Sequence, residues 1–270
     1  MAAASTRIAQ AFAKATAEGR KALVIYLTAG DPNIETSFEL ILAAADAGMD
    51  VLELGIPWSD PSADGLAIQG AMQRALEAGG GMSAALKLCR RLREARPALP
   101  IVLFGYANPI VVKGCAAFAK AAREAGADAV LCVDWPADED RELPNALAAE
   151  GLAFVPLLAP TSTPDRVRAA LDVAGGFVYY VSLTGITGAK LTDFSGPAAH
   201  VAQIRAAAEN RLPVVVGFGI ATAADVKTVA AFADGVVVGS AAVRVIETTP
   251  KDGVSKALST MIGGLAAGLK

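Results

Sequence analysis

The sequence predicts an α/β fold, a (β/α)8 TIM barrel, and two observations favour it. Short runs rich in Val, Ile, Leu and aromatic residues recur eight times along the 270 residues, and each precedes a Gly, Pro or Asp turn and an alanine-rich helical stretch. The runs are apolar on both faces, which is typical of parallel strands covered by helices. Eight such units in a chain of this length fit a closed barrel better than an open doubly wound sheet.

Most of the predicted strands begin about 22 to 36 residues apart, the length of one strand, its crossover helix and the return. The helices between them carry apolar residues at i, i+3, i+4 and i+7, as in residues 35–48 and 224–235. The first 20 residues are expected to form an extra helix that closes the bottom of the barrel. The strand segments are ALVIYLTAGDP from Ala22, DVLELGIP from Asp50, PIVLFGYANP from Pro100, DAVLCVDWP from Asp128, LAFVPLLAP from Leu152, GFVYYVSLTG from Gly176, LPVVVGFG from Leu212 and DGVVVGSA from Asp234.

The step from the second strand to the third is longer, at 50 residues. It contains the turn GIPWSDPSADG and the glycine run AGGGM. We therefore expect an elongated functional loop after the second strand and an extra short helix near IQGAMQRAL. The sequence shows no linker or low-complexity tract, so a single barrel domain is expected over residues 1–270.

Composition narrows the possible partners and compartments. A formal net charge of -3 provides no broad basic surface for nucleic acid or an anionic membrane. The three cysteines form neither a CxxC pair nor a metal-ligand pattern, which fits a reducing compartment. No signal peptide is recognisable, and no stretch approaches the roughly 20 apolar residues of a membrane span. A soluble, cytoplasmic protein is expected.

Active sites of such barrels lie at the carboxyl ends of the strands. No predicted strand carries a lysine, which counts against a Schiff-base aldolase. The only histidine, His200, lies in the alanine-rich stretch before the seventh strand, so no histidine-ligated metal site is expected. Cys132 lies within a strand and is interpreted as a small buried thiol. Among the kinds of catalysis considered, acid–base chemistry by carboxylates, assisted by tyrosine, is the one that the strand-end residues still allow.

Glu53 is the strongest acid–base candidate, because it lies within an apolar strand where burial raises a carboxyl pKa. The alternative is a side chain that points outward between helices and reaches water. Asp60 and Asp64 lie in the loop that follows, where plain turn-forming roles are the alternative. Asp31 and Asp134 end other strands, and each has the alternative of capping the following helix.

Glycine-rich strand ends predict a phosphate site in the second half of the chain. GITG follows the sixth strand, GFGI the seventh, and GSA ends the eighth. Backbone N–H groups beside a helix N-terminus can hold a phosphate dianion without lysine or arginine. The loops after strands seven and eight of such barrels commonly hold phosphate.

Several of these segments together resemble the tryptophan synthase alpha subunit family. YLTAGDP, LELGIPWSDPSADGLAIQ, YANP, VDWP, SLTGITGA, GFGI and VVVGSA occur in the family's order and spacing over residues 5–250. The resemblance implies retro-aldol cleavage of indole-3-glycerol phosphate to indole and glyceraldehyde 3-phosphate. It makes Glu53 the general acid/base at indole C3 and the glycerol hydroxyl, and Asp64 the carboxylate that binds the indole N–H and stabilises the positive charge on the ring.

The same resemblance assigns further residues. Tyr179 lies near the catalytic glutamate, and Thr187 lies in a loop that closes over the substrate. The phosphate is held by Gly188, Gly219, Gly239 and Ser240. The indole pocket is lined by Tyr26, Phe104, Tyr106, Leu131 and Phe218.

A partner is also implied. The resemblance predicts an alpha2-beta2 complex in which the beta subunit contacts Asp60, Pro61, Asn108 and Pro109. Pyridoxal phosphate is expected in that beta subunit, and no cofactor or metal is expected in this chain. Two alternatives stay open: a stand-alone indole-glycerol-phosphate lyase, and a non-catalytic phosphate-binding barrel.

Overall fold

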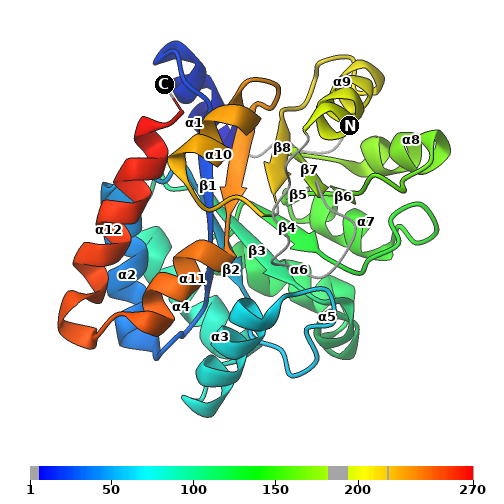
Figure 1. The fold of residues 1–270 in the computed structure, drawn as a ribbon. Coiled ribbons are helices and arrows are strands. Elements are labelled where there is room, and N and C mark those ends of the chain that lie inside the picture. The colour runs from blue at the N-terminus through cyan, green and yellow to red at the C-terminus, as the bar shows by residue number, and fades with distance from the viewer. Residues whose placement is uncertain (1–5, 182–193, 218, 270) are drawn as a thin grey trace.

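The computed structural model describes residues 6–181, 194–217 and 219–269, which form a curled parallel sheet surrounded by helices (Figure 1). The strand order is β5-β4-β3-β2-β1-β9-β8-β7-β6, and every paired neighbour is parallel. This arrangement confirms the predicted α/β barrel. The strands are β1 (Ala22–Thr28), β2 (Val51–Gly55), β3 (Ile101–Gly105), β4 (Ala129–Cys132), β5 (Ala153–Phe154), β6 (Leu157–Leu158), β7 (Val178–Val181), β8 (Val214–Gly217) and β9 (Gly235–Val238).

The predicted fifth strand is divided in two at Pro156. Before the proline, β5 pairs with β4, and the Val155 N–H donates to the Val130 carbonyl at 2.9 Å. After it, β6 pairs with β7, and the Pro156 carbonyl accepts the Tyr179 N–H at 3.0 Å. The break falls at a residue that has no N–H for a ladder bond. This one segment joins the two ends of the strand order and closes the barrel.

Helices cover the outside of the sheet throughout the described ranges (Figure 1). The predicted helices at 35–48 and 224–235 correspond to α2 and α10, which end earlier, and the long step between strands two and three holds both α3 and α4. The helices are α1 (Thr6–Ala17), α2 (Ile34–Asp46), α3 (Leu66–Glu77), α4 (Met82–Ala95), α5 (Ala107–Lys113), α6 (Cys115–Glu124), α7 (Glu142–Ala149), α8 (Pro164–Val173), α9 (Ser195–Ala207), α10 (Ala223–Ala230), α11 (Ser240–Thr248) and α12 (Lys251–Ala267).

Side chains alternate along each strand between the barrel interior and the layer of helices. In β1, Val24 and Tyr26 belong to the interior apolar cluster, whereas Leu23 and Ile25 belong to the cluster between sheet and helices. All four are buried. Nearly every strand position is therefore apolar because both faces of the strands are covered, as the sequence pattern indicated.

The N-terminal helix α1 packs on the end of the barrel interior, as predicted for a bottom-closing helix. Ile8 and Phe12 of α1 belong to the interior cluster. The Phe12 ring lies 5.9 Å from that of Phe177, centroid to centroid, just before β7 begins. Apolar side chains of α1 thus exclude water from the amino-terminal end of the strands, opposite the end where the site is expected.

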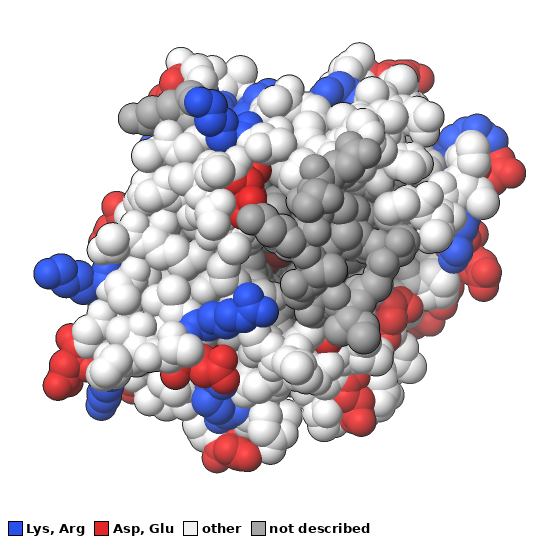
Figure 2. Space-filling model, viewed as in Figure 1, with Lys and Arg blue, Asp and Glu red and all other residues white. Residues whose placement is uncertain are grey.

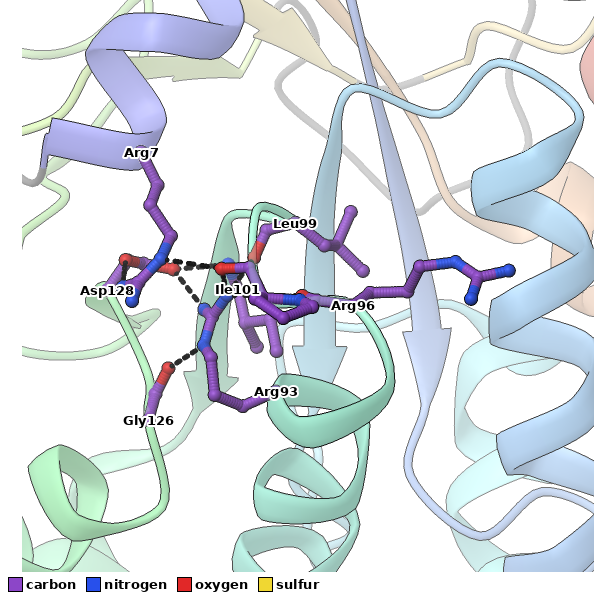
Figure 3. Close-up of polar contacts among 8 residues, drawn as sticks. Arg7, Arg93, Arg96, Leu99, Ile101, Gly126 and Asp128 are labelled. Carbon is purple, nitrogen blue, oxygen red and sulfur yellow. Dashed lines mark hydrogen bonds and ion pairs between the residues drawn. The ribbon is translucent and has the colours of Figure 1, made fainter.

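A buried aspartate joins three segments at this closed end (Figure 3). Asp128 precedes β4 and is 3% exposed. Its Oδ1 accepts a hydrogen bond from Nη1 of Arg7 at 2.9 Å, and its Oδ2 accepts one from Nη2 of Arg93 at 2.7 Å. The Ile101 N–H also donates to Oδ2, at 2.8 Å. One carboxylate therefore ties α1, α4 and the start of β3 together.

The aspartates that precede β2 and β9 make the same arrangement. Asp50 accepts the Leu23 N–H at 2.8 Å and pairs with Arg20. Asp234 likewise accepts a strand N–H, that of Val214 at 2.9 Å, and pairs with an arginine of α9. Each carboxylate satisfies a backbone donor at the start of the neighbouring strand. Three of the predicted strand segments begin with Asp for this reason.

Two aspartates at the other end of the strands do not cap the helix that follows them. The residue that caps α2 is Asn33, whereas Asp31 is buried and binds Nε and Nη2 of Arg74 at 2.8 and 2.9 Å. Asp134 accepts the N–H of Ala107, at the start of α5, at 2.7 Å. The capping alternative is therefore wrong for Asp31, and Asp134 caps a helix that precedes it in the chain.

The surface carries mixed charge. Figure 2 shows acidic and basic side chains interspersed around the rim of one face, with basic atoms also over α11 nearer the middle. None of the helices in the described ranges has both the length and the apolar character needed to cross a membrane.

Candidate active site

A cavity of about 300 Å³ lies at the carboxyl ends of the strands. Strand residues form its floor, the loop before α3 forms one side, and the starts of α10 and α11 form another. Eight of the predicted site residues are among those that line it: Tyr26, Glu53, Asp64, Phe104, Tyr179, Gly219, Gly239 and Ser240.

Glu53 points into the barrel and lines this cavity. In β2, Leu52 and Leu54 belong to the outer cluster and Val51 to the interior one, so alternation places Glu53 inside. Its exposure is 0%, and neither carboxylate oxygen has a hydrogen-bond partner among the described residues. Burial raises the pKa of Glu53 to about 8. The outward-pointing alternative is therefore wrong, and the carboxyl group is protonated at neutral pH.

Asp64 enters the same cavity from the loop between β2 and α3. The Tyr106 hydroxyl donates to its Oδ2 at 2.6 Å and accepts the Ala63 N–H at 3.2 Å. The Gln69 side-chain amide donates to the Asp64 carbonyl at 2.7 Å. Burial raises the pKa of Asp64 to about 6, although the hydrogen bond from Tyr106 lowers it. At pH 7 Asp64 is thus mainly ionised while Glu53 is mainly protonated. The two carboxyl groups therefore differ in role: Glu53 can donate a proton, and Asp64 can accept a hydrogen bond or a proton.

Aromatic side chains form the apolar part of the cavity. The rings of Tyr26 and Phe104 meet edge to face, with centroids 5.1 Å apart. Burial raises the pKa of Tyr26 and of Tyr179 well above 10, with smaller contributions from the site carboxylates. Both phenols therefore remain neutral hydrogen-bond donors in an enclosure that fits a flat aromatic ligand.

Two glycines to which the sequence assigned no packing role make room for these phenols. A Cβ on Gly55 would overlap the hydroxyl of Tyr26, and one on Gly217 would overlap that of Tyr179. Each glycine ends a strand next to the strand that carries the tyrosine. A sequence pattern could have indicated these contacts: a glycine at the last position of one strand, and a tyrosine two residues before the end of the neighbouring strand.

The start of α11 is open for an anion. Gly239 is its N-cap residue, so no side chain caps the helix, and the first turn holds no acidic residue. Ser240 follows and lines the cavity. By contrast, the start of α10 is occupied, since Thr222 and Asp225 form a capping box there. Gly219, in the loop between β8 and α10, also lines the cavity and has a φ of +72° that favours glycine. Free N–H groups at a helix start bind phosphate.

Other predicted residues lie outside the cavity lining. Leu131 is fully buried in the interior cluster, and Tyr106 reaches the site through its bond to Asp64. Thr187, Gly188 and Phe218 lie outside the described residues. The lining also includes residues for which the sequence predicted no individual site role: Ile68, Ile220, Ala221, Thr222, Asp225, Val237, Ala241 and Arg244.

The residues predicted to meet a partner lie beside the cavity. Asp60 is exposed and Pro61 partly exposed in the loop that carries Asp64. Asn108 and Pro109 are in the first turn of α5, directly after Tyr106. The loop and the helix are joined through the hydrogen bonds of the Tyr106 hydroxyl.

Metal-binding side chains do not cluster in the part of the chain that the structure describes, where no group of three His, Cys, Asp or Glu residues is placed to hold an ion. His200 lies on α9 on the outside of the barrel, with Nδ1 at 3.1 Å from the Tyr180 hydroxyl. Cys132 is a buried free thiol of the outer cluster.

Comparison with known proteins decides the family. The model of the family described as tryptophan synthase alpha chain matches residues 12–266. The chain belongs to the tryptophan synthase alpha chain family. The alpha chain of Burkholderia thailandensis is 45% identical to it over 264 residues, 98% of this chain and 97% of the relative. That of Ralstonia nicotianae is 44% identical over 264 residues, 98% and 99% of the two chains.

Solved structures of this family share the fold. The tryptophan synthase alpha chain of Legionella pneumophila superposes with a TM-score of 0.86 at 35% identity, covering 97% of each chain. A chain of Mycobacterium tuberculosis tryptophan synthase superposes with a TM-score of 0.89 at 32% identity, covering 98% of each. The family resemblance predicted from the motifs is confirmed over nearly the whole chain.

Proposed function

We propose that this chain carries out the reaction of its family, cleavage of indole-3-glycerol phosphate to indole and glyceraldehyde 3-phosphate in tryptophan biosynthesis, with Glu53 and Asp64 as its catalytic residues. One observation carries the assignment of the site. A fully buried glutamate that has no hydrogen-bond partner among the described residues and a second carboxylate of lower pKa line one cavity beside a helix start whose N-cap residue is glycine.

The two pKa values support the following proposed proton transfers. Protonated Glu53 donates its proton to indole C3, which places positive charge on the ring. The carboxylate formed at Glu53 then takes the proton of the glycerol hydroxyl. The O–H electrons form the new carbonyl, and the electrons of the breaking C–C bond return to the ring to give indole. Asp64, ionised, accepts a hydrogen bond from the indole N–H and stabilises the positive charge while it exists.

The remaining site residues would bind the two ends of the substrate. Tyr26, Phe104 and Tyr106 would contact or enclose the indole, and Tyr179 would donate a hydrogen bond close to Glu53. The phosphate would lie at the start of α11. Its ligands would be the backbone N–H groups of Gly188, Gly219, Gly239 and Ser240. Thr187 would support catalysis from the loop that closes over the substrate.

The partner proposed for this chain is the beta subunit of tryptophan synthase, which would hold pyridoxal phosphate in a cytoplasmic alpha2-beta2 complex. Asp60, Pro61, Asn108 and Pro109 would form part of the contact. Support comes from apolar exposure next to them: the exposed large hydrophobic residues among those described are Leu66, Val111 and Val112, at 82%, 56% and 82%.

Contact at this surface would reach the active site through one side chain. Tyr106 directly precedes α5, and its hydroxyl binds both Asp64 and the Ala63 N–H of the preceding loop. A partner that moves α5 or the loop therefore changes the position of Asp64. This geometry favours an alpha subunit whose activity depends on its partner over a self-sufficient lyase.

The test is steady-state indole release from indole-3-glycerol phosphate by the purified chain, with and without a beta subunit. We expect slow release that rises by orders of magnitude with the partner, and near-complete loss in Glu53→Gln. Fast release that the partner does not change would indicate a stand-alone lyase. No release, with phosphate binding intact, would indicate a non-catalytic barrel.

A further inference from the structure

One cationic side chain, that of Arg244, belongs to the described lining of the cavity. Among the lining residues, Glu53, Asp64 and Asp225 carry carboxyl groups, and Arg244 is the one lysine, arginine or histidine. A substrate phosphate adds up to two further negative charges to this enclosure. The balance of charge in the described lining is therefore unfavourable to an anion without Arg244.

The position of Arg244 fits contact with that anion. It lies on α11 four residues after Ser240, one turn from the uncapped helix start. Side chains of a helix lean toward its N-terminus, and Arg244 lines the same cavity as Gly239 and Ser240, so its side chain is on the side of the helix start. Arg244 is exposed and makes no ion pair with a described residue, so no internal partner among them competes for it.

Asp225 is an acidic residue of the same cavity lining. Its Oδ2 accepts the N–H groups of Ala221 and Thr222 at 3.2 and 2.9 Å, which keeps the carboxylate at the cavity edge. The start of α10 thus contributes the negative charge of Asp225 to the cavity. The start of α11 contributes the positive end of its helix dipole to the same cavity. An arginine is always protonated and can bind two phosphate oxygens at once.

We propose that Arg244 is a phosphate-recognition residue of this cavity, which attracts the phosphate dianion of the substrate to the start of α11. The proposal rests on the proposed function for the identity of the substrate. It adds a side-chain cation to a phosphate-binding site that was expected to consist of backbone N–H groups alone. Arg244 acts on binding and has no part in the transfer of protons at the indole.

The test measures binding of inorganic phosphate directly, by calorimetry at low ionic strength, and KM for indole-3-glycerol phosphate. In Arg244→Gln we expect the phosphate Kd and the KM to rise about tenfold, which corresponds to about 1.4 kcal/mol. The change in KM exceeds the change in kcat. Arg244→Lys keeps the charge and recovers most of the affinity, and added salt reduces the difference between the variants because it screens an exposed charge.

The matched control is Arg123→Gln, which removes the same charge from an exposed position on α6, outside the cavity lining. We expect it to bind phosphate as the unsubstituted chain does. Equal phosphate affinity in Arg244→Gln and Arg123→Gln, or no phosphate binding by the unsubstituted chain, would overturn the proposal for Arg244. Weakened phosphate binding in Arg244→Gln without any indole release from the unsubstituted chain would contradict the proposed reaction alone.

Discussion

Replacing Glu53 by glutamine should stabilise the fold while it removes the catalytic proton. Burial raises the pKa of Glu53 from 4.5 to about 8, so the folded protein retains a proton that the unfolded chain has already released. Ionisation then favours the unfolded state, and the free energy of unfolding of the unsubstituted protein falls as pH rises from about 4.5 to about 8. Glutamine has nearly the same shape and cannot ionise, so the variant escapes this loss.

The magnitude follows from the size of the pKa shift. Each pKa unit corresponds to about 1.36 kcal/mol, so the shift from 4.5 to about 8 destabilises the ionised protein by on the order of 5 kcal/mol above pH 8. At pH 7 the same linkage gives about 3 kcal/mol, and at pH 5 less than about 1 kcal/mol. Neither carboxylate oxygen has a partner among the described residues, so the substitution breaks no hydrogen bond with them.

Urea unfolding followed by circular dichroism at pH 5, 7 and 8.5 measures this difference. Glu53→Gln should be more stable than the unsubstituted chain by a margin that widens with pH, while indole release falls by about 10² to 10⁴. Glu94→Gln, at an exposed position on α4, serves as the control and should show no widening margin. Parallel stability curves for Glu53→Gln and the unsubstituted chain would refute the reasoning, because they would mean that Glu53 ionises as readily in the fold as in water.

Three further predictions concern the site and the closed end of the barrel. The pH profile of kcat/KM for indole-3-glycerol phosphate should be bell-shaped with limbs near about 6 and 8, since Asp64 must be ionised and Glu53 protonated; a flat profile across this range would contradict the assignment. Tyr106→Phe removes the hydrogen bond that lowers the pKa of Asp64, so the acid limb of the profile should move to higher pH in the same assay. An unmoved acid limb would mean that Tyr106 does not position Asp64. Asp128→Asn weakens the pairing with Arg7 and Arg93 and should lower the free energy of unfolding by about 3 to 5 kcal/mol in urea. Its KM should not change, and a loss confined to turnover would contradict this purely structural role.

The sequence by itself determined the architecture and most of the site's composition. Strands with two covered faces are apolar at nearly every position, and turn residues mark their ends, so all eight strand segments could be located along the chain. Asp50, Asp128 and Asp234 even marked where three strands begin. The loop around Asp64 and the glycines before α10 and α11 could be recognised because local backbone geometry restricts which residues occur there.

Tertiary structure decided the direction and partners of the side chains. The inward orientation of Glu53 depends on which alternate residues of β2 face the barrel interior. A strand whose neighbouring positions are all apolar does not show in its sequence which face is inside. The hydrogen bond from Tyr106 to Asp64 joins residues 42 positions apart. Likewise, only the folded chain shows that α10 is capped while α11 is open beside Arg244. Local sequence restricts backbone conformation, but the charge balance and pKa values of the cavity arise from groups that folding brings together from distant segments.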